Sequence, residues 1–177
     1  ALDVILNRKT KVQSWYLDTN MLANYWGSNR VYHHTAPVNM SYALYEALRI
    51  IHEEGLENCF ARHMRNHLAI KAGLSALDIQ YAAQEGHQLP MLNAVRIPDG
   101  VDDAAIRSGL LNRFGIEIGA GLGVMADKVW RIGLMGHACN ARNVYLCLNA
   151  LDDVLGRLNA PVEHGVAVAA AHKVLAG

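Results

Sequence analysis

The spacing of apolar residues changes near residue 76, and this change limits the class of fold that the chain can form. Between residues 38 and 76, apolar side chains recur at spacings of three and four, as on one face of a helix. Beyond that point the spacing shortens to that of strands, in residues 77–82, 91–97, 116–123 and 128–136. The order helix, helix, strand, strand, helix, strand, strand, helix predicts an α/β fold of the α+β kind, with helices on one face of a mostly antiparallel sheet.

Glycine and asparagine mark the ends of several predicted helices. Gly55 and Gly115 suit the residue just past a helix, and Asn140 suits an N-cap. We therefore expect a series of helices over residues 38–54, 56–76, 102–114 and 140–158, and a short alanine-rich helix within 162–176. Residues 14–27 are rich in aromatic side chains and predict a packed helix or loop, whereas residues 1–11 read as the remainder of a strand.

Charge and cysteine content narrow the classes of function. The chain has 16 basic and 16 acidic residues, which gives no support to nucleic acid or an acidic membrane surface as its main partner. Its apolar runs are too short or too interrupted to span a bilayer, and no signal peptide is visible. Three cysteines without a C-x-x-C motif indicate neither a disulfide framework nor a zinc ribbon, so we expect a reducing, cytoplasmic location. Because residue 1 is alanine inside an apparent strand, we expect the chain to be part of a longer polypeptide.

Residues 31–37 read VYHHTAP and place four hydrogen-bonding side chains in a row before a proline. Pro37 disfavours a helical conformation at the preceding residue and suits the start of the next helix, where backbone N–H groups lack partners. Together with those N–H groups, the hydroxyls of Tyr32 and Thr35 could clamp a phosphate. The alternative is a capped turn in which Thr35 bonds to its own backbone. The residue types alone leave both interpretations open.

Arg131 lies in the apolar stretch KVWRIGLMG, between Trp130 and Ile132. Alternation along a strand puts Trp130 and Arg131 on opposite faces. A buried arginine is costly without an anionic partner, and its planar fork fits a carboxylate through two parallel hydrogen bonds. That carboxylate could belong to a ligand, or to an aspartate or glutamate of the same domain in a structural salt bridge.

The stretch GIEIGAGLG raises the possibility of a dinucleotide-binding loop. Its glycine spacing differs from G-x-G-x-x-G, and no long helix is predicted directly after it. Glycines that follow a strand more often mark a turn or a close approach of the backbone, which is the interpretation that we favour.

The stretch HMRNH places His63 and His67 one helical turn apart, a spacing that zinc sites use. The glutamate of an H-E-x-x-H motif is absent, and no third ligand is evident. Because Arg62 and Arg65 flank the pair, we interpret both histidines as solvated side chains.

Several stretches together closely resemble the C-terminal half of class V pyridoxal-phosphate aminotransferases, a family that includes alanine–glyoxylate and serine–pyruvate aminotransferases. The matching stretches are SWYLD, NYWG, VYHHTAP, LPMLNAVRIPDGVD, IEIGAGLG and KVWRIGLMG. The resemblance runs from about Arg8 to about Leu158, and Ala120 departs from the GGGLG form of the glycine stretch. It implies the C-terminal part of a fold-type I enzyme that uses pyridoxal 5'-phosphate. The implied reaction moves an amino group from L-alanine or L-serine to glyoxylate or a similar small 2-oxo acid.

The resemblance also implies roles for three residues. Tyr32 and Thr35 would reach across the interface of a homodimer to the phosphate of the partner subunit's cofactor, and Arg131 would bind the substrate carboxylate. The two histidines between Tyr32 and Thr35 would serve as scaffold. The lysine that carries the cofactor in this family lies upstream of residue 1, and Lys9 and Lys11 align beyond it. We therefore assign no catalytic residue and expect the chain to be inactive by itself.

The resemblance predicts three parts: residues 1–36 as the end of the large cofactor domain with an interface segment, 37–160 as the small domain, and 161–177 as a helical tail. Two other functions stay open. The chain could be a non-catalytic binding and dimerisation module for a lysine-bearing partner chain. It could also belong to a desulfurase-like lyase of the same class, although its cysteines lie in or beside predicted helices rather than on a mobile loop.

Overall fold

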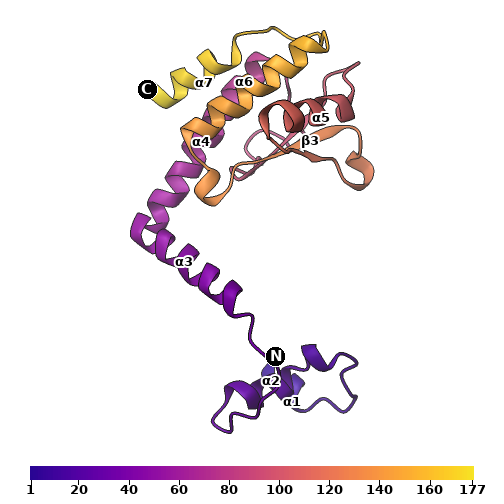
Figure 1. Ribbon diagram of the computed structural model, residues 1–177, viewed down its shortest axis with the longest axis vertical. Coiled ribbons are helices and arrows are strands. Elements are labelled where there is room, and N and C mark those ends of the chain that lie inside the picture. The colour runs from indigo at the N-terminus through magenta and orange to yellow at the C-terminus, as the bar shows by residue number, and fades with distance from the viewer. The chain divides into compact units, whose positions relative to one another are not determined.

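The computed structural model describes all residues from 1 to 177. The chain divides into two compact units, Ala1–Ile50 and Ile51–Gly177, and the boundary falls within helix α3 (Val38–Glu54). Each unit is described by itself below, and the elements of both are labelled in Figure 1. None of the helices combines the length and the hydropathy that crossing a membrane requires.

The first unit is helical and contains no strand. It comprises α1 (Leu2–Leu6), the 3-10 helix η1 (Trp15–Leu17), α2 (Thr19–Trp26) and the part of α3 up to Ile50. Asp18 caps α2, because its Oδ1 accepts hydrogen bonds from the N–H groups of Asn20 and Met21 at 3.0 and 3.3 Å. The prediction of a strand in residues 1–11 is wrong. A short apolar run does not distinguish strand from helix, and Leu2–Leu6 closes a helical turn instead.

The second unit contains four further α-helices and two 3-10 helices, η2 (Gly123–Met125) and η3 (Gly136–Ala138). The α-helices are α4 (Leu56–Ala76), α5 (Asp103–Phe114), α6 (Ala141–Arg157) and α7 (Ala167–Ala176). The predicted caps are confirmed: the side chain of Asn140 accepts from the N–H of Asn143 at 3.0 Å, and Gly115 takes a left-handed φ of 64° after α5. Helix α7 packs against α4 and α6. A Cβ atom at Gly73 of α4 would lie 3.0 Å from the carbonyl oxygen of Ala167, so glycine allows this close approach.

The sheet of the second unit has three strands, β1 (Leu92–Arg96), β2 (Gly119–Ala120) and β3 (Val129–Gly133). Their order is β1-β3-β2, and both pairs are antiparallel, which confirms the predicted sheet type. The strands expected at 77–82 and 116–123 are much reduced. The first forms only a bridge from Tyr81 to Val95, and positive φ angles at Asp78 and Gly123 interrupt the extended backbone near both segments.

Helices cover one face of this sheet. Trp130, Ile132 and Val95 point into a core that also contains buried side chains of α4, α5 and α6. Trp130 is fully buried, and its Nε1–H donates to Asp103 Oδ1 of α5 at 2.9 Å. Removing such a side chain typically costs roughly 3–5 kcal/mol. The alternation of β3 therefore anchors Trp130 among the helices and sends Arg131 to the opposite face.

Candidate functional site

The hydroxyl groups of Tyr32 and Thr35 face solvent and contact each other. Their oxygen atoms lie 3.0 Å apart, and the Tyr32 side chain is 69% exposed. Thr35 makes this bond rather than one to its own backbone, which argues against the capped turn. Helix α3 begins three residues later, so its first N–H groups follow the two hydroxyls directly in the chain. This segment offers hydrogen-bond donors of the kind that bind phosphate.

His33 and His34 hold this segment in place through hydrogen bonds and ring contacts. The Nε2 atom of His33 lies 3.1 Å from the carbonyl oxygen of Trp15, and its ring stacks on the Trp15 indole at a centroid distance of 4.2 Å. Because a carbonyl only accepts, His33 Nε2 is the donor in this contact, and the Nδ1 atoms of His33 and His34 lie 2.8 Å apart in a further hydrogen bond. Tyr25 packs on the rings of both Tyr32 and His34. These contacts give the histidines the scaffold role expected of them.

Arg131 has no acidic partner in the chain. Its only side-chain hydrogen bond runs from Nε to the carbonyl oxygen of Ala120 at 2.7 Å, and no Asp or Glu forms an ion pair with it. The structural salt bridge is therefore absent. The neighbours of Arg131 in the register are Ala94 on β1 and Gly119 on β2. Both are small, and the terminal guanidinium nitrogens make no hydrogen bond within the chain.

Gly119 explains part of the glycine-rich stretch. A Cβ atom there would lie 3.1 Å from Nη2 and 3.4 Å from Cζ of Arg131, so a larger residue would push the guanidinium away. Gly121 instead allows a close approach of the backbone, because a Cβ atom there would clash with the carbonyl oxygen of Met125. Ala120 contributes its backbone carbonyl to Arg131. Its departure from glycine therefore leaves the contact intact.

His67 is buried and His63 is half-buried, so the interpretation of both as solvated side chains is wrong for His67. His67 is 4% exposed and bonds through Nδ1 to Asn93 Oδ1 at 2.8 Å, while His63 bonds to backbone groups through both ring nitrogens. Both side chains lie on the face of α4 that packs against the sheet and its loops, which the adjacent arginines concealed in the sequence. No group of residues in the chain has the arrangement of a metal site.

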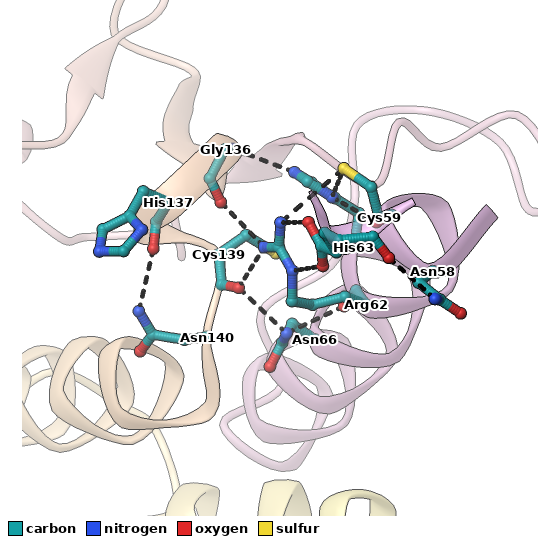
Figure 2. A network of polar contacts seen from close by, with 10 residues as sticks. Asn58, Cys59, Arg62, His63, Asn66, Gly136, His137, Cys139 and Asn140 are labelled. Atoms are coloured by element: carbon teal, nitrogen blue, oxygen red, sulfur yellow. Dashed lines mark hydrogen bonds and ion pairs between the residues drawn. The ribbon is translucent and has the colours of Figure 1, made fainter. Parts of the chain in front are cut away.

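Two polar networks escaped the sequence analysis. Asn93 is fully buried, accepts from Tyr81 OH at 2.7 Å as well as bonding to His67, and donates to the carbonyl oxygen of Ile132 at 3.3 Å. Arg62 of α4 pairs with Glu54 and with the loop that follows β3 (Figure 2). The only sign of the Asn93 network in the sequence was a polar residue within an apolar strand pattern. Nothing in the sequence indicated the contacts of Arg62.

Cys139 and Cys147 lack the features of a catalytic thiol. Cys139 is fully buried, and burial raises its pKa above the ordinary value. Burial also raises the pKa of Cys147 to about 11. Both thiols are therefore protonated at neutral pH, whereas the thiolate is the nucleophile. These observations remove support from the desulfurase-like interpretation.

Comparison with known proteins relates these features to one group of enzymes. The chain is 40% identical over 166 residues to the (S)-ureidoglycine–glyoxylate transaminase of Bacillus subtilis, covering 94% of this chain and 40% of that protein. It is 42% identical over 159 residues to the alanine–glyoxylate aminotransferase of Callithrix jacchus, covering 88% of this chain and 38% of that protein. A scan against protein-family models finds no match.

Solved structures agree with the sequence relatives. The crystal structure of the Bacillus subtilis ureidoglycine–glyoxylate aminotransferase matches 99% of this chain and 46% of that chain, with a TM-score of 0.94 and 40% identity. An alanine–glyoxylate aminotransferase from Nostoc sp. matches 87% of this chain and 41% of that chain, with a TM-score of 0.83 and 48% identity. The chain thus spans about 40% of the length of the sequence relatives, in their C-terminal part.

Proposed function

This chain is homologous to the C-terminal part of class V aminotransferases, and we propose that it serves as that part of a pyridoxal-phosphate-dependent enzyme. The proposed reaction transfers an amino group from a small amino acid, such as L-alanine or L-serine, to glyoxylate or a similar small 2-oxo acid. The names of the relatives support glyoxylate as the acceptor.

The unpaired fork of Arg131 is the observation that carries the proposal. An arginine held by one backbone carbonyl, beside a glycine that makes room for it, is arranged to receive a carboxylate through two parallel hydrogen bonds. Amino acids and 2-oxo acids both carry a carboxylate next to the reacting carbon. One arginine can therefore orient the donor and the acceptor in the same way, which favours reaction by positioning.

We assign cofactor binding to Tyr32 and Thr35. Their exposed hydroxyls lie close enough to donate to neighbouring oxygens of one phosphate, and the start of α3 favours negative charge nearby. The resemblance to class V aminotransferases implies that this phosphate would belong to the cofactor of the second subunit in a homodimer. When bound, pyridoxal phosphate supplies the electron sink that makes transfer of the amino group possible.

The lysine that holds the cofactor is assigned to residues outside this chain. Lys71 is engaged with Glu85 at 2.6 Å, Lys128 donates to the carbonyl oxygen of Val124 at 3.1 Å, and Lys173 is exposed on α7. Lys9 and Lys11 follow the position of that lysine in the family pattern. The chain by itself would therefore bind substrate and phosphate groups without turning over.

The test is transamination between L-alanine and glyoxylate by the complete polypeptide that carries this segment. We expect activity in the wild type and a large loss of kcat/KM in Arg131→Ala, with the cofactor still bound. If a cofactor-loaded protein moved no amino group from any small amino acid, the proposal would be wrong. Activity that appeared only after adding a separate lysine-bearing chain would favour the binding-module alternative.

A further inference from the structure

Two consecutive residues of α4 hold Gly136, three residues beyond the end of β3, from both sides. The N–H of Gly136 donates to Nε2 of His63 at 3.0 Å, and its carbonyl oxygen accepts from Nη1 of Arg62 at 2.9 Å. Gly136 itself takes a left-handed φ of 54°, which favours glycine. Figure 2 shows both side chains converging on this residue. The backbone N–H and C=O of one residue are thus both satisfied by a neighbouring helix.

The side chains of Arg62 and His63 are themselves held in place by hydrogen bonds. His63 Nδ1 lies 2.7 Å from the carbonyl oxygen of Cys59, so Nδ1 carries the proton and Nε2 is left as a bare acceptor for Gly136. Arg62 donates from Nη2 to Glu54 Oε2 at 2.8 Å and from Nη1 to the carbonyl oxygen of Cys139 at 2.8 Å. The loop therefore has one defined position rather than several.

Met135, the residue before Gly136, lies on the same face of the sheet as Arg131. Met135 is 52% exposed, and its Cε atom lies 3.3 Å from where a Cβ atom of Gly133 would be. Gly133 follows Arg131 by two positions in β3. Both residues therefore lie on the same face of the sheet, with their Cα atoms roughly 7 Å apart. Because glycine has no side chain, Gly133 leaves space open on that face of the sheet. The thioether of Met135 covers this space.

Resting on the proposed function, we infer that Met135 is an apolar wall of the substrate site that contacts the side chain of the amino acid bound at Arg131. Arg62 and His63 position this wall through Gly136. A carboxylate on the Arg131 fork would carry the α-carbon and its substituent outward from the sheet, on the face that Met135 covers. A thioether side chain is flexible and polarizable and packs well against apolar groups. Its volume takes up space that a longer substrate side chain would need.

Selectivity between two donors tests the contact. In the complete enzyme loaded with pyridoxal phosphate, kcat/KM is measured for L-alanine and for L-norvaline, with glyoxylate as acceptor. We expect Met135→Ala to raise the ratio of norvaline to alanine on the order of tenfold, the scale of discrimination by an apolar pocket. Met135→Leu, which conserves volume, is the matched control and should change the ratio little. An unchanged ratio in Met135→Ala, with a wild type that transaminates, would overturn the inference and leave the proposed function standing.

A separate experiment tests whether His63 positions Met135 through Gly136. His63→Ala should raise the same ratio, and His63→Gln should restore it, because the Gln amide oxygen can accept from the N–H of Gly136. Hydrogen exchange at the Gly136 amide should quicken in His63→Ala and slow again in His63→Gln. A ratio that stays at the wild-type value in His63→Ala while that amide exchanges faster would refute positioning. A cofactor-loaded wild type that used neither donor would overturn the proposed function and this inference together.

Discussion

The hydroxyl oxygens of Tyr32 and Thr35 lie 3.0 Å apart on an exposed segment, with each hydroxyl the other's only hydrogen-bond partner in the chain. Two hydroxyls that satisfy only each other can exchange that bond for bonds to an anion at small cost, because both already face solvent. The buried ring of His33 and its stacking on Trp15 keep the segment in place while this happens.

From this pair we expect Tyr32→Phe and Thr35→Val each to weaken binding of pyridoxal phosphate in the complete enzyme. A lost hydrogen bond to a charged group costs roughly 1.5–3 kcal/mol. Absorbance titration of the apoenzyme with the cofactor measures the change. Thermal unfolding without cofactor serves as the control and should shift little, since both side chains are exposed. Cofactor affinity equal to that of the wild type in both variants would remove them from the site.

Arg131→Lys should retain the positive charge and lose the planar two-point grip on a carboxylate. We expect kcat/KM for amino acids to fall by an equivalent of roughly 2–4 kcal/mol, the scale of a truncated charge pair. Steady-state kinetics measure this loss, and urea unfolding should show little change in stability. If the variant instead unfolded early and its folded fraction kept normal substrate affinity, Arg131 would be structural.

Gly119→Ala should weaken substrate binding without touching any polar group. The added Cβ would meet the guanidinium of Arg131 at 3.1 Å from Nη2, so the fork must move. We expect KM for both the amino acid and the 2-oxo acid to rise. Ala120→Gly is the matched control in the same strand, because it preserves the carbonyl that receives Arg131 Nε. Equal kinetics in the two variants would contradict the role given to Gly119.

Borohydride reduction tests whether the chain supplies the cofactor lysine. We expect the isolated chain, mixed with pyridoxal phosphate and reduced, to show scattered labelling of surface lysines and no transamination. The reason is that the family position of that lysine lies outside the chain. Peptide mass spectrometry locates the label. A stoichiometric adduct on one lysine, together with transamination activity, would refute the expectation.

Tyr81 should be the last of the seven tyrosines to ionise. Burial, and then the negative charge of Glu85, raises the pKa of Tyr81 well above its ordinary value. A raised pKa in the folded state contributes stability that is present below the ordinary value of about 10 and is lost as pH rises beyond it. Ultraviolet titration should show one tyrosine that ionises only as the chain unfolds, and Tyr81→Phe should remove it. Tyr16→Phe is the control on an exposed position. An unchanged late phase in Tyr81→Phe would reject the assignment.

The sequence by itself determined most of the local structure from residue 38 onward. The three-and-four spacing predicted helices over 38–54 and 56–76, and Asn140 and Gly115 marked helix ends where the structure has them. Alternation in β3 placed Trp130 and Arg131 on opposite faces. Helix hydrogen bonds, caps and the two-residue strand period all join neighbours along the chain, so neighbouring residues suffice to predict them. The motifs VYHHTAP and KVWRIGLMG likewise pointed to the residues of the candidate site.

Only the tertiary structure decided what those side chains meet. Arg62 reaches backbone carbonyls 74 and 77 positions away, and His63 accepts from an N–H 73 positions away. His67 is buried against Asn93 rather than solvated, and Arg131 rests on the carbonyl of Ala120 instead of a carboxylate. Such contacts depend on how helices and strands pack and on the register of β1 and β2 against β3. Periodicity specifies which face a residue occupies, whereas the partner on that face is set by elements distant in the sequence.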